Sequence, residues 1–260
     1  MKNKKLYIGI DVGGTNMRGG IFRSGSTRPL GTLEIKTPKT KAKFLTALNT
    51  LAATLAAKHK IAGIGIGLPG TVDHARGILI RAKRIPFLKN WNIQKFFATF
   101  KAPVKADNDC KCFLTAEATY GAGRGYKNIV AIAIGSGIGS GIMIDGKIYR
   151  GGHNTAGEIG HTVIDGNRTF EQLAAKDAFL KHGDRSAVIG IGIANAINTF
   201  DPDVVIIGGG GGLSRHVHLP TVRTAVRRHV IRSLLGKTKI TKAELGDFGP
   251  AIGAAILLQT

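Results

Sequence analysis

The chain has 260 residues, 43% of them hydrophobic and 20% charged, a balance typical of a globular protein that buries one large core or two smaller ones. Its 37 Lys and Arg residues outnumber its 16 Asp and Glu residues, which gives a formal net charge of +21. Glycine or charged residues interrupt every long apolar stretch, so the sequence predicts no membrane-spanning segment and no membrane partner.

The basic start of the chain, Met1 to Lys5, runs into a short strand rather than into an apolar leader with a cleavage site. The only two cysteines, Cys110 and Cys112, are separated by one residue, which is too tight for an ordinary disulfide in a helix or strand. We therefore expect no export signal and a cytoplasmic location.

The large positive charge attracts polyanions, so a polyanion-binding protein without catalysis is one alternative. Against it, the basic residues are scattered along the chain, and few aromatic side chains are available to stack on bases. We favour a solvated basic surface and expect no specific nucleic-acid partner.

The chain opens with three short predicted strands, at residues 6–11, 17–22 and 32–36. Apolar residues then recur every three or four positions between Lys41 and His59, which predicts an amphipathic helix. A further strand, residues 61–67, follows directly. Strands and a helix in this order indicate an α/β protein.

The same opening pattern occurs a second time between Asn128 and Tyr149, where an apolar strand, a glycine-rich turn and two more strands follow one another. The corresponding turn glycines, Gly13 and Gly137, lie 137 − 13 = 124 residues apart. A duplicated strand-turn-strand unit predicts two similar lobes that face each other across a cleft.

The rest of the chain continues the alternation of helices and strands. We expect a helix at residues 187–200, a strand at 204–207, a helix through 223–235 and a final helix from about Pro250. No linker or low-complexity stretch separates these elements.

The first glycine-rich turn, Asp11-Val-Gly-Gly-Thr-Asn-Met-Arg18, has the composition of a phosphate-binding loop. Gly13 and Gly14 let the backbone turn sharply and bring its N–H groups against phosphate oxygens, while Thr15 and Asn16 add side-chain donors. Asp11, at the end of the strand, is placed to hold Mg²⁺ through water.

The second glycine-rich turn runs from Gly135 to Gly141 and is equally suited to phosphate, with a hydroxyl from Ser136 and backbone N–H groups near Gly137 and Gly139. Because it occupies the same place in the repeated unit, we expect the two loops to close on one phosphate chain.

Two further patterns point to chemistry. Asn108 and Asp109 precede an amphipathic stretch and so begin a helix, where either a capping role or a catalytic role suits them. The apolar strand after Asp201 runs into five glycines, and Gly209 and Gly210 among them would let a flat ring approach the backbone.

Together these motifs resemble the ROK family of sugar kinases and related repressors, within the sugar kinase, actin and Hsp70 superfamily. The resemblance covers nearly the whole chain, and Gly157-Glu-Ile-Gly-His161 is its most specific motif. The other matching segments are Leu68 to Asp73, Ile85 to Trp91, Asn108 to Glu117, Asp201 to Gly211 and Gly249 to Ala255. The resemblance implies a ribonuclease H-like (actin-like ATPase) fold, ATP and Mg²⁺ as cofactors, and a homodimer.

The resemblance also assigns roles to particular residues. It makes Asp109 the base that accepts the proton of the attacking sugar hydroxyl. The sugar-binding residues that it implies are Gly70, Asn108, Glu158, His161 and Glu171. It places adenine and ribose at Gly209 and Gly210. The expected activity is transfer of the γ-phosphoryl group of ATP to the 6-hydroxyl of a hexose, first of all glucose.

We expect residues 1–106 and the last helix, 248–260, to form a small lobe with the first phosphate loop. Residues 107–247 then form a large lobe with the second phosphate loop, the sugar loop and the adenine site. Most members of the family carry a Cys-rich zinc loop after the Gly157 to His161 motif, but Thr162 to Thr169 contains no cysteine, so we expect no zinc site.

Two other functions stay open. The zinc-free, shortened sequence after His161 resembles compact polyphosphate glucokinases, and the positive charge suits a long polyanion, so a polyphosphate-dependent glucokinase or glucomannokinase is an alternative. A sugar-sensing repressor would need a helix-turn-helix domain, for which we expect no room before Asp11.

Overall fold

The computed structural model describes residues 5–259, so residues 1–4 of the basic start lie outside the described part. The chain forms two compact units. Unit 1 extends to Ala116 and takes up the chain again from Phe248, and unit 2 spans Glu117–Asp247. The first boundary falls inside helix α3 (Asp109–Tyr120), ten residues after the boundary that the sequence predicts at 106.

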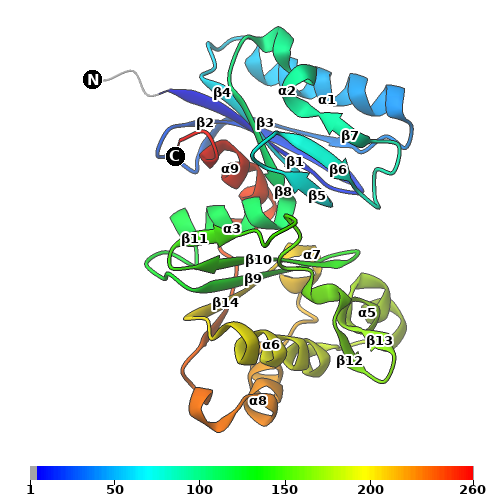
Figure 1. Cartoon of the computed structure of the whole chain (residues 1–260), viewed down its shortest axis with the longest axis vertical. Helices are drawn as coiled ribbons and strands as arrows, with labels where there is room; N and C mark the ends of the chain where they lie inside the picture. The colour runs from blue at the N-terminus through cyan, green and yellow to red at the C-terminus, as the bar shows by residue number, and fades with distance from the viewer. Residues whose placement is uncertain (1–4, 260) are drawn as a thin grey trace. The chain divides into compact units, whose positions relative to one another are not determined.

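Unit 1 is built on a five-stranded sheet of order β3-β2-β1-β4-β8 (Figure 1). Its strands are β1 (Leu6–Val12), β2 (Asn16–Arg23), β3 (Pro29–Lys36), β4 (Gly63–Leu68) and β8 (Val104–Asn108). The first three form an antiparallel meander, β4 adds in parallel to β1, and β8 adds in parallel to β4. Parallel strands bring their carboxyl ends to one edge of a sheet, so the ends of β1, β4 and β8 meet there.

Helices α1 (Lys41–Ala56) and α9 (Gly249–Ile256) cover opposite faces of this sheet. Gly19 of β2 faces the leucines of α1, whereas Gly9 and Gly65, paired across β1 and β4, face α9. A Cβ on Gly9 or Gly65 would collide with backbone carbonyl groups of α9. The two glycines therefore permit a backbone-to-backbone approach that any side chain would block.

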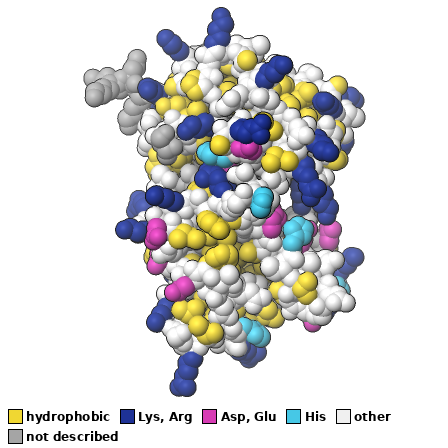
Figure 2. Space-filling view, in the orientation of Figure 1, with side chains coloured by type: hydrophobic (Ala, Val, Ile, Leu, Met, Phe, Trp, Pro, Cys, Tyr) yellow, Lys and Arg dark blue, Asp and Glu magenta, His cyan; other side chains and the backbone are white. Residues whose placement is uncertain are grey.

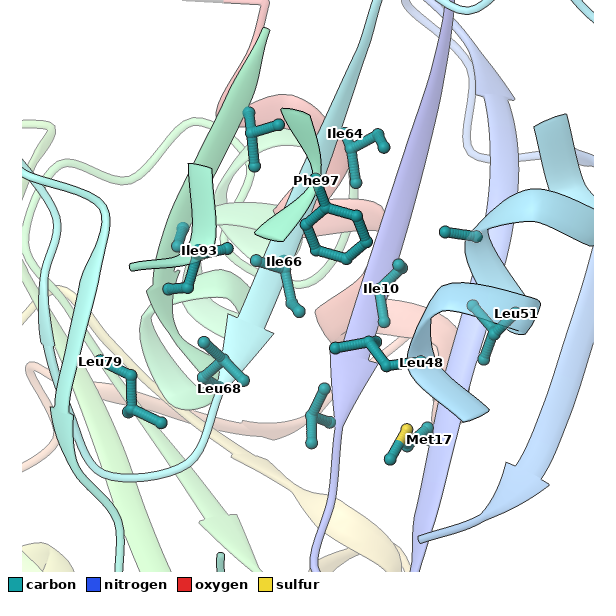
Figure 3. Packing of buried hydrophobic residues seen from close by; sticks show 14 of the residues in the cluster. Ile10, Met17, Leu48, Leu51, Ile64, Ile66, Leu68, Leu79, Ile93 and Phe97 are labelled. Atoms are coloured by element: carbon teal, nitrogen blue, oxygen red, sulfur yellow. The ribbon is translucent and has the colours of Figure 1, made fainter. Parts of the chain in front are cut away.

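The core of unit 1 fills the face of the sheet that α1 covers (Figure 3). Ile10 and Ile66 are paired on neighbouring strands and fully buried, and Leu48 of α1 is buried in the same cluster. The three-to-four spacing of apolar residues in α1 thus serves to cover the sheet, as the sequence predicts.

A second, three-stranded sheet of unit 1 connects β4 to β8. It consists of β5 (Thr71–Asp73), β6 (Ile78–Arg81) and β7 (Lys89–Asn92). Helix α2 (Ile93–Phe96) and a 3-10 turn (Ala98–Phe100) follow it. Ile93 and Phe97 are fully buried and join the main core of the unit.

Unit 2 repeats the sheet of unit 1, with order β11-β10-β9-β14-β15 (Figure 1). Its strands are β9 (Ile129–Ile134), β10 (Ile138–Ile144), β11 (Lys147–Tyr149), β14 (Val204–Gly208) and β15 (Lys239–Lys242). Again three strands form an antiparallel meander and two more add in parallel. The predicted duplication is therefore present in both topology and strand direction.

The helices of unit 2 differ in part from those predicted. They are α4 (Phe170–Ala174), α5 (Lys176–His182), α6 (Ser186–Phe200), α7 (Gly209–Gly212) and α8 (Leu219–His229). The helix predicted at 223–235 is α8, which begins four residues earlier because Pro220 occupies its first turn, where proline is favoured. It ends at His229 because Val230 is extended, and a separate 3-10 turn (Arg232–Leu234) follows.

Short elements complete the chain: a 3-10 turn (Ile159–His161), the hairpin of β12 (Val163–Asp165) and β13 (Arg168–Thr169), and a 3-10 turn (Gly246–Phe248). Within residues 5–259, no helix combines the length and the apolar character needed to cross a membrane.

On the face shown in Figure 2, Lys and Arg side chains lie over many different elements and do not gather into one patch. Acidic side chains are fewer on this face and stand apart from one another. This distribution agrees with the scattered basic surface that the sequence predicts.

Candidate functional site

The turn between β1 and β2 is closed by its own backbone and held from β3. The Gly13 N–H donates to the Asn16 carbonyl at 2.9 Å. Thr37, just after β3, donates its hydroxyl to the Gly13 carbonyl at 2.7 Å and its N–H to the Thr15 carbonyl at 2.8 Å. The Gly13 and Thr15 carbonyl groups are thereby directed toward the buried Thr37, whereas the Gly14 carbonyl accepts from the exposed Lys39 ammonium at 2.7 Å.

The N–H groups at the tip of the turn remain for an outside ligand. Among the described residues, neither the Gly14 N–H nor the Thr15 N–H has a hydrogen-bond partner. Adjacent unpaired backbone N–H groups at a turn form an anion-binding concavity. The Asn16 amide donates to Glu34 at 2.5 Å, and Glu34 also pairs with Arg18. The role of Asn16 as a phosphate donor stays a prediction.

Two buried carboxylates lie in register at the carboxyl ends of parallel strands. Asp11 of β1 pairs with Gly67 of β4, which pairs in turn with Asp107 of β8. Paired positions share a face of the sheet, so both carboxylates project on the side of Gly67. Asp107 is 1% exposed and Asp11 is 9% exposed. No contiguous motif marks Asp107, although its place at the end of a parallel strand is a usable signal.

The start of α3 is fixed by Asn108, the last residue of β8. The Asn108 Oδ1 atom accepts from the backbone N–H of Cys110 at 3.0 Å and of Lys111 at 3.2 Å, which is N-cap geometry. Its Nδ2 atom donates to the Gly70 carbonyl at 3.1 Å. The capping interpretation of Asn108 thus holds, and the same side chain ties the Gly70 loop to the helix.

Asp109 is the first residue of α3 and is partly exposed. Its Oδ1 atom accepts from the Cys110 N–H at 2.9 Å, which orients the carboxylate at the positive end of the helix dipole. A Cβ on Gly67 would lie 3.4 Å from the Asp109 Cα. Asp109 therefore lies beside the strand position to which Asp11 and Asp107 are paired.

The second glycine-rich turn is shorter than predicted. The Gly135 N–H donates to the Gly137 carbonyl at 2.8 Å, and β10 begins at the next residue. Ser136 is exposed at the tip. Gly139 lies outside the turn, because it pairs with Ala133 inside the β9–β10 ladder, and its role in phosphate binding stays a prediction.

The segment from Gly157 to His161 packs on β10. A Cβ on Gly157 would collide with the Ser140 carbonyl, and one on Gly160 with the Ile138 carbonyl. The Ser140 hydroxyl also donates to the Gly157 carbonyl at 2.6 Å. The two glycines hold the segment on the strand that begins at the second turn.

The polar side chains of this segment project outward. The Glu158 and His161 side chains are 53% and 63% exposed, and the Glu158 Oε2 atom lies 3.8 Å from the His161 Nε2 atom. Two polar groups held by a buried backbone and directed to solvent are suited to a ligand with several hydroxyl groups.

Glu171 lies in the first turn of α4, directly after the β12–β13 hairpin. Its Oε2 atom accepts from the backbone N–H of Ile138 at 2.9 Å. Glu171 therefore anchors the residue that follows the second turn. A carboxylate has a second oxygen and further acceptor capacity for a ligand hydroxyl.

The glycines after β14 form the short helix α7 rather than an open loop. A Cβ on Gly209 would collide with the Ile134 carbonyl at the end of β9, whereas nothing lies within 4 Å of one on Gly210. The space beside Gly210 is therefore open, and the predicted place of a flat ring there stays a prediction.

The segment predicted to lack zinc, Thr162 to Thr169, forms the β12–β13 hairpin. Cys112 is buried against Ala254 of α9, and Cys110 is partly exposed. Within residues 5–259, no group of three or more His, Cys, Asp or Glu side chains is arranged to hold a metal ion.

The predicted residues thus gather on two surfaces. Unit 1 brings together Asp11, Gly14, Thr15, Gly70, Asn108 and Asp109 at the ends of β1, β4 and β8. Unit 2 brings together Ser136, Gly137, Glu158, His161, Glu171, Gly209 and Gly210 around the β9–β10 connection.

Known proteins share this fold over their whole length. A glucokinase from Streptomyces griseus, solved with glucose and AMPPNP, is 25% identical with a TM-score of 0.85, and the match covers 97% of this chain and 98% of that one. The inorganic polyphosphate/ATP-glucomannokinase of Arthrobacter sp. strain KM is 28% identical with a TM-score of 0.78, over 98% of each chain. The N-acetyl-D-glucosamine kinase of Photobacterium profundum is 29% identical over 97% of this chain and 99% of its own.

These matches confirm the predicted ribonuclease H-like (actin-like ATPase) fold class. The model of the ROK family matches residues 7–180 and 178–260, which together span nearly the whole sequence. The chain belongs to the ROK family.

Proposed function

We propose that this protein is a sugar kinase that transfers the γ-phosphoryl group of ATP to the 6-hydroxyl of a hexose, with glucose as the first acceptor to test. One observation carries the proposal: unit 1 combines a turn with unpaired N–H groups at Gly14 and Thr15 with an oriented carboxylate at Asp109. An anion-binding turn alone would suit many ligands, and the added base makes phosphoryl transfer to a hydroxyl the best-supported reaction.

On the donor side, the Gly14 and Thr15 N–H groups bind phosphate oxygens, and Ser136 and Gly137 of unit 2 supply further donors. The adenine ring lies against the backbone at Gly209 and Gly210. Asp11 would hold Mg²⁺ through water, because its carboxylate lies at the end of β1 beside the phosphate turn and Mg²⁺ usually keeps several waters while one or two carboxylates bind it. The ion, when bound, offsets the negative charge of the phosphates.

On the acceptor side, Asp109 orients the sugar hydroxyl and accepts its proton. The hydroxyl oxygen forms a bond to the γ-phosphorus as the bond from that phosphorus to the bridging oxygen breaks, and ADP leaves. The proton passes to the Asp109 carboxylate, so charge and atoms balance. Ionisation of Asp109 suits its place at a helix N-terminus, where the dipole favours negative charge.

The sugar ring is bound by Asn108 beside the Gly70 loop and by Glu158, His161 and Glu171. Carboxylate oxygens accept from sugar hydroxyls, and the imidazole of His161 either donates or accepts. Glucose is our first choice because a glucokinase is among the similar structures, and an N-acetylated hexose follows from the similarity to an N-acetylglucosamine kinase. A homodimer and a cytoplasmic location belong to the same proposal.

The test is a coupled assay of the full chain over a panel of hexoses and N-acetylhexosamines, with ATP and Mg²⁺. We expect saturable phosphorylation of at least one sugar, with glucose the best. Turnover of an amino sugar alone would change the acceptor. Binding of a sugar without turnover of any would instead support a sugar-sensing protein.

A second donor is supported by two observations. The net charge of +21 favours a long polyanion, and one similar structure is named as using both inorganic polyphosphate and ATP. The assay therefore includes inorganic polyphosphate at matched phosphate concentration. Activity with polyphosphate and none with ATP would overturn ATP as the donor.

A further inference from the structure

One histidine holds the connection between β5 and β6 against the end of β8. His74 directly follows β5, and β5 contacts β8 (Figure 1). The His74 Nδ1 atom lies 2.8 Å from the Ala106 carbonyl oxygen and 3.5 Å from the Asp107 Oδ2 atom. A carbonyl oxygen only accepts, so Nδ1 carries a hydrogen and donates it. The neutral ring is therefore the Nδ1–H tautomer, and the protonated ring keeps the same hydrogen.

The turn that carries His74 is stiffened from within. The Asp73 Oδ1 atom accepts from the Arg76 N–H at 3.0 Å, as aspartate side chains commonly do with the backbone of a turn. Gly77 ends the turn at a φ of 63°, a left-handed conformation that favours glycine. The Gly77 carbonyl then accepts from the Ile93 N–H at 3.1 Å. The backbone of this turn thus fixes where the imidazole starts.

Asp107 passes the contact with His74 on to the start of α3. The Asp107 Oδ1 atom accepts from the Asn108 N–H at 2.9 Å, while Oδ2 faces the imidazole, and the carboxylate is buried. The peptide that begins with this N–H belongs to the N-cap residue of α3, and Asp109 follows directly. The buried carboxylate therefore links the imidazole to the residue that precedes Asp109.

The Gly70 loop is tied to the same end of β8 by a second hydrogen bond. The Asn108 side chain donates to the Gly70 carbonyl at 3.1 Å, and His74, four residues later (74 − 70 = 4), donates to Ala106 at 2.8 Å. Strand β5 lies between these two attachments. Loss of the second attachment would let β5 and the end of β8 move apart and would shift the N-cap that precedes Asp109.

We propose that His74 is a positioning residue for Asp109, acting through Asp107 and Asn108 rather than by contact with a substrate. Rates of proton and phosphoryl transfer fall steeply when a reacting group is displaced, so a positioning residue affects turnover more than binding. A residue that only stabilises the fold would lower the free energy of unfolding and leave kcat unchanged. The proposal rests on the proposed kinase function and adds one residue to its acceptor side.

The experiment compares His74→Asn, His74→Gln and His74→Ala in the full chain. The amide nitrogen of asparagine takes the place of Nδ1, because both atoms are bonded to Cγ, whereas glutamine carries its amide one carbon farther out. His59→Ala is the control, since His59 is exposed shortly after α1 and its side chain has no hydrogen bond or ion pair among residues 5–259. Urea unfolding of each variant shows whether the fold persists.

The readouts are kcat, the sugar KM, the donor KM, and amide hydrogen exchange at Cys110 and Lys111, whose N–H groups Asn108 caps. We expect His74→Ala to lower kcat by about tenfold, with both KM values within about twofold of the wild type. Exchange of the two amides should quicken by about two- to tenfold, the loss of about one hydrogen bond. His74→Asn should recover most of both losses, and His74→Gln little.

The proposal is overturned if His74→Asn and His74→Gln behave alike, or if His74→Ala keeps the kcat of the wild type while its stability falls. Amide exchange needs no turnover, so it separates this proposal from the proposed function. A wild type that phosphorylates no sugar overturns the kinase function alone. In that case, faster exchange in His74→Ala but not in His74→Asn still supports the positioning of α3, and unchanged exchange in His74→Ala overturns it.

Discussion

The Glu171 carboxylate accepts a hydrogen bond from the backbone N–H of Ile138 at 2.9 Å, which joins α4 to the first residue after the second glycine-rich turn. The partners are 33 residues apart in sequence. If Glu171 also binds the sugar, one oxygen of its carboxylate accepts from the Ile138 N–H and holds the turn, and the other oxygen accepts from a sugar hydroxyl.

This double role predicts different outcomes for two substitutions. Glu171→Gln keeps an oxygen for the Ile138 N–H but weakens acceptance from sugar hydroxyls, so the sugar KM should rise while the donor KM stays near that of the wild type. Glu171→Ala removes both functions and should raise both constants. Steady-state kinetics with each substrate varied in turn give the two KM values for each variant. Equal effects of Glu171→Gln and Glu171→Ala on the sugar KM and the donor KM would show that Glu171 only shapes the turn.

Replacing Glu158 or His161 should raise the sugar KM with a smaller effect on the donor KM, because both side chains project toward solvent from the segment that packs on β10. We expect about tenfold for Glu158→Gln, consistent with loss of one charged hydrogen bond. Exposed Glu34 gives a poor control because it pairs with Arg18, so Glu244→Gln is used instead. A fall in nucleotide affinity instead would assign this segment to the donor.

Much of the fold is predictable from local pattern. Alternating or continuous apolar runs with glycine turns indicate both meanders, and the repeat of that pattern predicts two similar units. Periodicity does not show which strands pair: β14 adds in parallel to β9 and β15 adds in parallel to β14, although these segments lie far apart in sequence. The end of α8 at His229 also escapes prediction, because the basic residues that follow do not by themselves stop a helix.

The site is predictable where a motif is contiguous and escapes prediction where it depends on register. Gly14, Thr15 and Asp109 lie in short recognisable patterns, whereas Asp107 acquires its place beside Asp11 only through pairing with Gly67. Gly139 is hard to place from sequence because glycine occurs both in turns and in strands that another backbone approaches closely.

Glu117 should be a stability residue rather than a binding residue. It is fully buried, and its carboxylate accepts from the backbone N–H groups of Ala122, Glu244 and Leu245 at 2.9 to 3.1 Å. Glu117→Ala would leave these donors unpaired and should destabilise the protein by about 3 kcal/mol or more. Urea unfolding measures the change. Glu244→Ala is the matched control, since only the backbone of Glu244 takes part, and an equal loss in both variants would refute the role.

Asp184 should make the folding stability of the protein depend on pH in the acid range. The hydroxyl of Ser186 donates to Asp184 and is the main cause that lowers the pKa of this carboxyl below its ordinary value of 3.8. The Ser186 N–H, His218 and His216 lower the pKa further, and burial opposes them. A lowered pKa in the folded state gives stability that is present above 3.8 and lost as the pH falls through the folded value.

The difference in melting temperature between the wild type and Asp184→Asn should therefore be largest near neutral pH and shrink below pH 3.8. Thermal unfolding from about pH 7 down to about pH 3 tests this, with the sign set by the lowered pKa. A difference that stays constant over the whole range would mean that the charge of Asp184 contributes nothing.

The most direct test of the proposed chemistry is Asp109→Asn. Asparagine keeps an oxygen that can accept from the Cys110 N–H, and Asn108 still caps α3, so the fold and sugar binding should persist. Turnover should fall by about two orders of magnitude or more, because a positioned base is lost. Asp145→Asn, in the exposed turn between β10 and β11, controls for removal of a carboxylate and should retain wild-type turnover. Calorimetry with the best sugar separates binding from catalysis, and a variant that keeps more than a tenth of the wild-type turnover would remove Asp109 from the mechanism.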